Sequence, residues 1–242
     1  MTETDARRLI LALDAAGLAC SVAVGFEDRI LADKRVDSLY GQAEILVSLV
    51  DKAMCEARVE PAALEVVVAT IGPGSFTGIR VGLAAARGIA LATGAQLIGV
   101  TGFEAVGAEV ARGDRPKSHA LLIALESRRK DLYVQFFDPD GHRHGEPAAV
   151  MPCVLGEAAS AAIGAQPLLI AGDASRRAAA ALPQRTNILV VKDSAPSAVG
   201  ALRVGLRRLR QGEATRAARP LYLRPPDVTP PDGSRKRSRA EP

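Results

Sequence analysis

The residues of this chain with the clearest capacity for chemistry lie in a glycine-rich turn between residues 71 and 80. Three glycines, one proline and two hydroxyl side chains gather there: Gly72, Pro73, Gly74, Ser75, Thr77 and Gly78. The pattern predicts a buried strand before the turn, over 66–69, and a helix after it, over 81–92. Backbone N–H groups at the start of a helix attract anions, so the turn could hold a phosphate through Gly74 and Ser75. The alternative is a tight strand-to-helix connection in which Ser75 caps the helix.

Two charged residues could add to such an anion site. Asp14 ends the first predicted strand, over 9–13, where an acid can position a metal-bound nucleotide. The favoured interpretation is that it caps the following turn. Arg128 holds the matching place in the second half of the chain, where it would either contact an anion or lie in a solvated hairpin turn. The glycine turn is not a Walker A loop, because no lysine follows its glycines.

Other catalytic groups and metal ligands are sparse. His142 and His144 lie in a predicted turn without a third ligand nearby in sequence. No histidine is placed by a motif to activate Ser75, so a serine-hydrolase triad is not expected. The three cysteines have neither a disulfide framework nor zinc spacing, and we expect them to be buried. The sequence therefore predicts no catalytic residue and no metal site.

The elements that must position these residues repeat in two halves. In the first half, strands are predicted over 9–13, 19–24, 29–36, 66–69 and 97–100, and helices over 42–57, 81–92 and 103–112. A polar break at 113–118 marks the boundary. In the second half, strands are predicted over 120–125, 131–137, 147–151, 168–170 and 188–191, and helices over 155–163, 173–182 and 197–211.

Three antiparallel strands followed by alternating helices and strands are typical of the ribonuclease-H-like, actin-like (ASKHA) fold. We therefore predict an α/β protein with two similar lobes, each a mixed sheet flanked by helices. The lobes would span 1–113 and 114–224. Residues 225–242, rich in proline, aspartate, serine and arginine, are predicted to form a disordered basic tail.

Bulk composition fits an ordinary globular protein, with 48% hydrophobic and 24% charged residues. The formal net charge is +4. The excess of positive charge lies in residues 203–242, which permits contact with nucleic acid. The first residues do not fit a secretory signal, and no stretch reaches the length of a membrane-spanning helix. We expect a cytoplasmic protein that does not contact membranes.

Four segments resemble the TsaB family. Residues 9–14 followed by 20–24 are similar to the opening of that family, and residues 72–82 (GPGSFTGIRVG) are similar to its most characteristic motif. Residues 97–101 (LIGVT) are similar to the strand that follows, and residues 220–224 (PLYLR) resemble its C-terminal signature. The resemblance covers roughly residues 9 to 224.

This resemblance implies a role in tRNA modification. TsaB-like proteins help to install the threonylcarbamoyl group on the adenosine next to the anticodon, as non-catalytic partners of the paralogue TsaD. TsaE is implied as an ATPase partner, and TsaC as the source of the threonylcarbamoyl-adenylate donor. The expected arrangement is a heterodimer with TsaD, or a homodimer in its absence, with tRNA contacted through the complex. No cofactor would be bound tightly, and ATP or ADP would lie at the boundary with TsaD.

The helix that follows the glycine turn is expected to form the partner surface together with the helix over 42–57. Gly78, Gly82, Ala86 and Ala90 are spaced by four, so one helix face carries little bulk and allows close approach. Packing within the chain itself is the alternative explanation. The partner contacts expected from the two helices are Ile45, Leu49, Ile79, Gly82, Leu83, Ala86 and Ala90.

Three departures from the family pattern weaken the case for independent nucleotide binding. Asp14 is followed by Ala15 and Ala16, where the family often has hydroxyl residues, and Glu126 replaces a common aspartate. A histidine common before the first long helix is replaced near Gly41. An ATP-dependent phosphotransferase of the actin-like class, using Asp14 and the glycine turn, remains the alternative function. A glycoprotease-like peptidase is a further alternative with less support.

Overall fold

The computed structural model describes residues 8–37, 42–113, 116–192, 194–213 and 217–224. The predicted tail at 225–242 and the departure near Gly41 lie outside these residues. Among the described helices, none combines the length and the apolar character needed to cross a bilayer.

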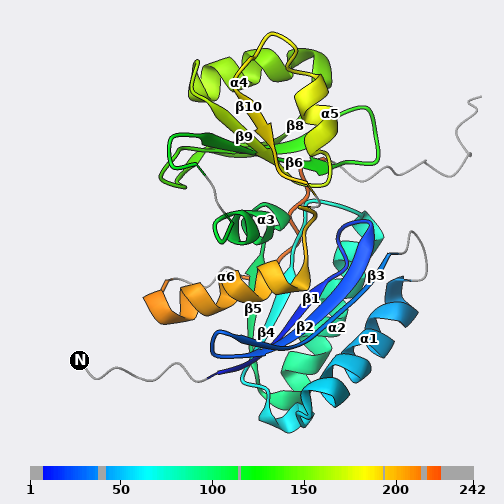
Figure 1. Ribbon diagram of the computed structural model, residues 1–242. Helices are drawn as coiled ribbons and strands as arrows, with labels where there is room; N and C mark the ends of the chain where they lie inside the picture. The colour runs from blue at the N-terminus through cyan, green and yellow to red at the C-terminus, as the bar shows by residue number, and fades with distance from the viewer. Residues whose placement is uncertain (1–7, 38–41, 114–115, 193, 214–216, 225–242) are drawn as a thin grey trace, which may run out of the picture.

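Two five-stranded mixed sheets form the core, and their strands follow the same order (Figure 1). In the first sheet the order is β3-β2-β1-β4-β5, and in the second it is β8-β7-β6-β9-β10. The first sheet consists of β1 (Leu9–Asp14), β2 (Ala19–Phe26), β3 (Arg29–Asp37), β4 (Val66–Thr70) and β5 (Gln96–Val100). The second consists of β6 (Ala120–Glu126), β7 (Leu132–Phe137), β8 (Arg143–Val150), β9 (Leu168–Ala171) and β10 (Ile188–Val190). The predicted fold, with two similar lobes, is confirmed.

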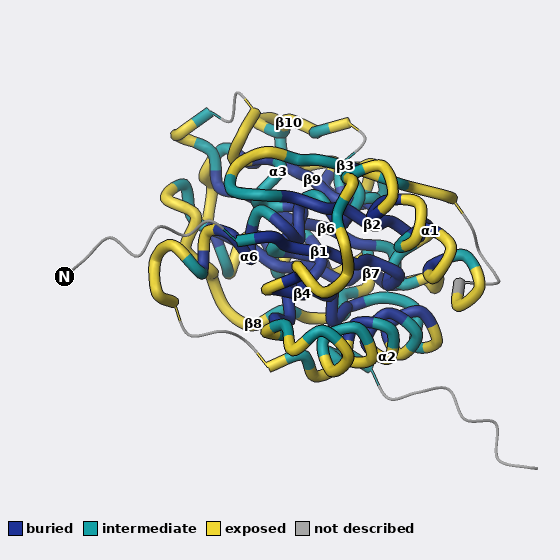
Figure 2. Tube along the Cα trace, turned by 90° about the horizontal axis from the view of Figure 1, so that it is seen from below, coloured by how far each residue is buried: buried dark blue, intermediate teal, exposed yellow. Residues whose placement is uncertain are grey.

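Helices cover both faces of the first sheet because its central strand is apolar on both sides. Leu9, Leu11 and Leu13 of β1 pack against α1 (Gln42–Ala57) and α2 (Phe76–Thr93). Ile10 and Ala12 point the opposite way, toward α6 (Ala198–Gln211). Figure 2 shows the buried strands enclosed by these partly exposed helices.

The second sheet is covered by α4 (Leu155–Ile163) and α5 (Ser175–Ala180) on one face. Its other face packs on α3 (Gly102–Val110), which thus lies between the two sheets. Strand β8 begins earlier than the predicted strand over 147–151. Pro147 is tolerated there because β8 is an edge strand whose pairing with β7 shifts register near that proline.

Helix α6 was expected in the second lobe, but it packs on the first sheet and on α3 (Figure 1). Two glycines make the close approach feasible. A Cβ atom on Gly200 would lie 2.5 Å from the carbonyl oxygen of Ala105, and one on Gly205 would lie 2.7 Å from the Val68 side chain. The predicted second lobe, over 114–224, therefore includes a helix that packs on the first lobe.

Residues 217–224, here called the C-terminal strap, also return to the first lobe. The amide of Leu221 donates a hydrogen bond of 2.8 Å to the carbonyl oxygen of Ile71. Arg224 then reaches the second lobe, where its guanidinium lies 2.7 Å from a carboxylate oxygen of Asp131. The strap thus contacts both lobes and the connection between β4 and α2.

The buried carboxylate of Glu104 joins α3, α6 and the second lobe. Its Oε2 accepts hydrogen bonds from the amide (2.8 Å) and hydroxyl (2.9 Å) of Thr101, which completes a capping box at the start of α3. Its Oε1 pairs with Arg208 of α6 at 2.6 Å and with Arg143 of β8. Burial alone would raise the pKa of Glu104, but the Thr101 hydrogen bonds and the charges of Arg208 and Arg143 hold it below its ordinary value.

We predict that Arg208→Gln lowers the free energy of unfolding by about 3 kcal/mol. Removing one partner of a buried ion pair is costly, and Glu104 keeps Arg143, which limits the loss. The exposed neighbour Arg207 is the control, and Arg207→Gln should change stability by less than about 0.5 kcal/mol. Urea denaturation measures both variants. Because the pKa of Glu104 is lowered in the folded state, its stabilising contribution is fully present above pH 4.5. It is lost as the pH falls from 4.5 through the pKa of the folded state. Equal stabilities for the two variants would contradict this role.

Candidate functional site

The glycine turn is fastened to the β1–β2 turn by backbone contacts. The amide of Ser75 donates a 2.8 Å hydrogen bond to the carbonyl oxygen of Ala16. A Cβ atom on Gly74 would lie 2.1 Å from that same oxygen, so a larger residue does not fit. Ser75 also caps α2, since its hydroxyl accepts a hydrogen bond from the amide of Gly78 at 3.2 Å. The capping interpretation of Ser75 is confirmed.

Gly72 is also required in this turn, because of its backbone conformation and its close contact with the strap. Its φ of +106° lies in the left-handed region, and an added Cβ would meet the carbonyl oxygen of Leu221 at 2.8 Å. The C-terminal strap therefore lies directly against the turn. Thr77 is exposed on the first turn of α2.

Asp14 is buried, with 2% exposure. Its Oδ1 accepts hydrogen bonds from the amide of Ala16 at 3.1 Å and from the hydroxyl of Thr70. Burial raises the pKa of Asp14, although the hydrogen bonds from Thr70 and Ala16 and the charge of Arg35 oppose this rise. The interpretation as a turn cap is confirmed. Thr70, the side-chain partner, was not singled out by the sequence, because the pairing depends on β1 and β4 being neighbours.

A cleft of about 280 Å³ separates the lobes beside the glycine turn. Its walls come from residues 73–77, from the loop 127–129 and from the strap residues 221–224. Arg128 crosses between the lobes and donates a 2.9 Å hydrogen bond to the carbonyl oxygen of Gly17. Of the four residues predicted to contact an anion, Gly74, Ser75 and Arg128 are thus brought together at this cleft. Asp14 is not among its lining residues.

An aromatic pair joins the strap to α2 at the cleft wall. The rings of Phe76 and Tyr222 lie 5.1 Å apart between centroids. The Arg80 guanidinium sits 3.7 Å above the Phe76 ring and donates a 3.2 Å hydrogen bond from Nε to the Tyr222 hydroxyl. The role of the strap was missed from sequence, although the segment PLYLR was the available signal.

The predicted partner residues of α2 belong to the core. Ile79, Leu83 and Ala86 are buried against the first sheet, together with Leu49 of α1. A Cβ on Gly82 would lie 3.6 Å from that of Ala15, within the chain. Ile45 and Ala90 are partly buried on the same core. The small-residue stripe therefore serves packing within the chain, and these side chains do not form an exposed surface as predicted.

The opposite face of α2 is exposed and carries a second series of small residues. Ala84, Gly88 and Ala92 are spaced by four and exposed, and Leu91 beside them is 88% exposed. A Cβ added to Gly88 would meet no atom within 4 Å. The sequence did hold a signal for this face, because Arg80 and Arg87 stand seven residues apart and mark one side of the helix.

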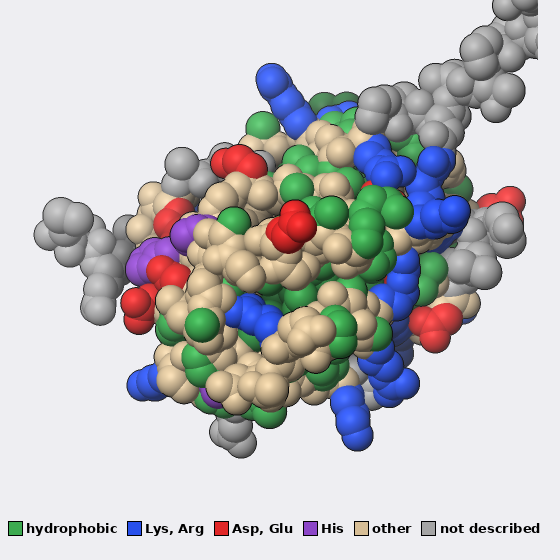
Figure 3. All heavy atoms as spheres, turned by 90° about the horizontal axis from the view of Figure 1, so that it is seen from above, with side chains coloured by type: hydrophobic (Ala, Val, Ile, Leu, Met, Phe, Trp, Pro, Cys, Tyr) green, Lys and Arg blue, Asp and Glu red, His purple; other side chains and the backbone are tan. Residues whose placement is uncertain are grey.

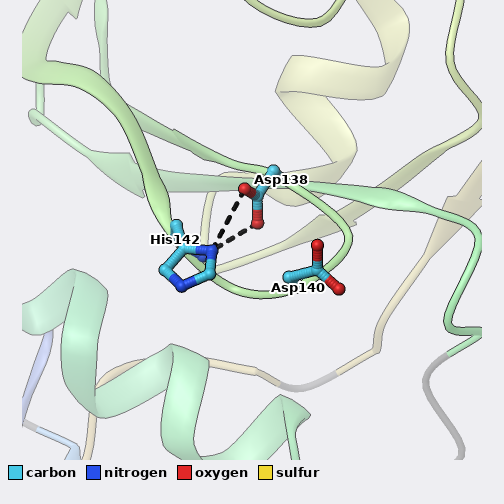
Figure 4. Close-up of side chains that lie close together, drawn as sticks. All are labelled: Asp138, Asp140 and His142. Atoms are coloured by element: carbon cyan, nitrogen blue, oxygen red, sulfur yellow. Dashed lines mark hydrogen bonds and ion pairs between the residues drawn. The ribbon is translucent and has the colours of Figure 1, made fainter.

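The β7–β8 turn gathers Asp138, Asp140 and His142, whose possible ligand atoms all lie within 4.8 Å of one another (Figure 4). Asp138 accepts hydrogen bonds from the amide of His142 at 2.8 Å and has the ring Nδ1 of His142 within 3.3 Å. These contacts shape a hairpin turn whose residues are not among those that line the cleft.

The duplicated sheet order and the cleft between the lobes define a two-lobed protein of the actin-like ASKHA class. A polyphosphate/ATP-glucomannokinase from an Arthrobacter strain shares this architecture at 14% identity, with a TM-score of 0.52 and coverage of 84% of this chain and 99% of the kinase. A Pseudomonas aeruginosa protein described as similar to the peptidase YeaZ matches 90% of this chain and 100% of its own, with a TM-score of 0.75 and 24% identity.

The chain is similar in sequence to proteins of the TsaB and TsaD type. Residues 41–155 match the family model of TsaD, the tRNA N6-adenosine threonylcarbamoyltransferase. The tRNA threonylcarbamoyladenosine biosynthesis protein TsaB of Escherichia coli is 30% identical over 141 residues, which are 57% of this chain and 59% of that protein. An uncharacterised Mycobacterium tuberculosis protein is 30% identical over 226 residues, covering 91% of this chain and 94% of its own. The named relatives act in threonylcarbamoyladenosine modification of tRNA.

We predict that Gly74→Ala lowers the free energy of unfolding by about 2–3 kcal/mol. The added methyl would overlap the carbonyl oxygen of Ala16 and break its hydrogen bond with Ser75. Gly17, in the facing turn, has open space around its Cβ position, so Gly17→Ala should change stability by less than about 0.5 kcal/mol. Thermal and urea unfolding compare the two variants. A Gly74→Ala protein as stable as the wild type would contradict this account of the contact between Gly74 and Ala16.

We predict that Asp14→Asn stabilises the chain more at pH 7 than at pH 4. The folded state raises the pKa of Asp14, so the wild type loses stability as pH rises from 3.8 through the folded pKa. Asparagine keeps an acceptor for Ala16 and Thr70 but cannot ionise. Urea denaturation at several pH values measures the difference between variant and wild type. A difference independent of pH, or one that grows on acidification, would contradict the burial effect.

Proposed function

We propose that this chain is a non-catalytic subunit of the tRNA threonylcarbamoylation machinery that pairs with and supports a catalytic TsaD subunit. The exposed face of α2, with Gly88 at its centre, is the observation that carries the pairing. Sequence similarity supports the pathway, because the relatives include both TsaB and the threonylcarbamoyltransferase TsaD.

The cleft supports a non-catalytic role. Its described lining offers hydroxyls, backbone and arginines, and no histidine or carboxylate faces Ser75 from it. Asp14, the acid that a phosphotransferase of this class would need, is buried and bound to Ala16 and Thr70. The geometry thus favours neither the phosphotransferase nor the peptidase alternative.

Gly88 points to a partner because nothing inside the chain requires it. A glycine within a helix costs about 1 kcal/mol relative to alanine. Gly88 has an ordinary helical backbone, and a Cβ there would meet open space. Ala84, Ala92 and the almost fully exposed Leu91 surround it. Such a surface allows another helix to approach closely and lets Leu91 bury its side chain.

We call this exposed surface of α2 the outer helical face: Ala84, Gly88, Leu91 and Ala92. Val47 is 58% exposed, and α1 packs beside α2 on the same side of the first sheet. Our proposal places TsaD on the outer helical face. In the absence of TsaD the same face would join two copies of the chain, since a two-fold dimer uses one patch twice.

Nucleotide, if present, would be shared with TsaD. The β1–β2 turn fits a phosphate poorly, because Ala16 directs its carbonyl oxygen at Ser75 and Ala15 has no polar side chain. Arg128 and the first turn of α2 could still contact an anion held mainly by the partner. TsaE remains an expected component of the assembly.

We predict that Gly88→Gln weakens pairing with the cognate TsaD by about tenfold or more while raising the stability of the lone chain by about 0.5–1 kcal/mol. Glutamine favours the helix but blocks close approach. Size-exclusion chromatography and calorimetry of the mixed proteins measure the pairing, and thermal unfolding measures the stability. The same variant should reduce any homodimer to a monomer.

The matched control is Gly156→Gln. Gly156 is also a helical glycine with open space around its Cβ position, but it lies on α4 in the other lobe. It should leave pairing unchanged. If Gly88→Gln pairs as tightly as the wild type, the outer helical face is not the interface; if the wild type forms no complex, the proposed function itself fails.

A further inference from the structure

We infer that the wall of the interlobe cleft is a contact surface for the phosphates of tRNA. This inference rests on the proposed function and assigns the RNA to a place on this chain. Three segments lie at or next to the cleft: residues 73–80, 127–131 and 217–224, of which 73–77, 127–129 and 221–224 line it. Together they carry six cationic side chains, which we call the cleft cluster: Arg80, Arg128, Arg129, Lys130, Arg219 and Arg224.

The cleft cluster has little negative charge of its own. Asp131 is the one carboxylate in the three segments, and it is buried and paired with Arg224. Helix α2, which begins at this cleft, contains no acidic residue along its whole length. Figure 3 shows Lys and Arg side chains gathered along one side of the molecule, whereas carboxylates are scattered. Positive charges spread over several segments attract a polyanion more strongly than a single small anion.

The loop that carries three of the cations is held rigidly. Arg177 donates hydrogen bonds of 3.1 Å to the carbonyl oxygens of Arg129 and Lys130, and it also pairs with Glu126. Arg128 is fixed by its bond to Gly17 in the other lobe. Backbone ordering of this kind reduces the entropy lost when the side chains bind phosphates.

Aromatic side chains stand among the cations, as they do in many RNA-binding surfaces. Tyr222 is 37% exposed and lines the cleft together with Phe76. A ring at this position offers a face to an unpaired base, while the neighbouring guanidinium groups contact the backbone. The cleft itself, at about 280 Å³, is too small for a whole polynucleotide, so the contact runs along its wall.

The test removes three exposed cations and leaves the interlobe hydrogen bond of Arg128 intact. The variant combines Arg129→Gln, Lys130→Gln and Arg219→Gln. The matched control removes the same charge from exposed positions away from the cleft, through Arg112→Gln, Lys117→Gln and Arg207→Gln. The probe is a fluorescently labelled, unmodified tRNA transcript with adenosine next to the anticodon. Binding to the full-length chain, alone and mixed with TsaD, is measured by anisotropy at several salt concentrations.

We expect the cleft variant to lose about tenfold or more in affinity and to reduce the slope of log K against log salt by about three. The control should lose much less. Pairing of the cleft variant with TsaD in size-exclusion chromatography should remain unchanged, which separates this inference from the proposed function. Equal affinities for variant and control would overturn it. Loss of TsaD pairing would assign the cleft cluster to a protein interface, and displacement of the tRNA by excess Mg-ATP would assign it to a nucleotide; either result also overturns it.

Discussion

The buried carboxylate of Glu104 is the interaction on which the arrangement of the two lobes depends. A buried charge is tolerated only when its oxygens are fully hydrogen-bonded or paired. Glu104 meets this condition with Thr101 in its own helix, Arg208 in α6 and Arg143 in the second lobe. Each partner comes from a different part of the chain, so the charge is satisfied only when the first lobe, the last helix and the second lobe have all reached their final positions.

The position of α6 follows from this constraint and explains why the last part of the chain returns to the first lobe. Once Arg208 is bound, the second face of the first sheet is covered, and the strap continues past the glycine turn to Asp131. Arg128 of the second lobe then contacts Gly17 in the first lobe, and Arg224 of the strap contacts Asp131 in the second. The two lobes are consequently linked by side-chain contacts from the loop 127–129 and from the strap. Such a body suits a partner that presents fixed surfaces.

The two surfaces assigned above share helix α2 but differ in chemistry. The outer helical face consists of small and apolar side chains, which suit close packing with another protein. The cleft cluster is cationic with two aromatic rings, which suits a polyanion. The glycine turn fixes the positions of both surfaces, because Gly74 and Ser75 set where α2 begins and in which direction it leaves the sheet.

Local sequence determined most of the elements. Apolar runs fixed the strands, and Ser75 and Thr101 were recognisable helix caps because the capping bonds involve residues three positions apart. The two halves of the chain share the same order of predicted strands and helices, and this repetition predicted the two lobes. The glycine motif marked the turn that lines the cleft in the structure. The cysteines were expected to be buried, yet Cys55 and Cys153 are exposed, because a free cysteine carries no local signal of its environment.

Only the tertiary structure decided which face of α2 points inward. Both faces carry small residues spaced by four, so this spacing does not distinguish Gly82 from Gly88, and Arg80 and Arg87 show which side is polar but not what packs on the other. The contact of Gly82 with Ala15 and the open space around Gly88 arise from the way α2 crosses β1 and β4. The same holds for Asp14 and Thr70, for Arg208 and Glu104, and for the strap. These pairs lie far apart in sequence, and their energies depend on packing that no local pattern contains.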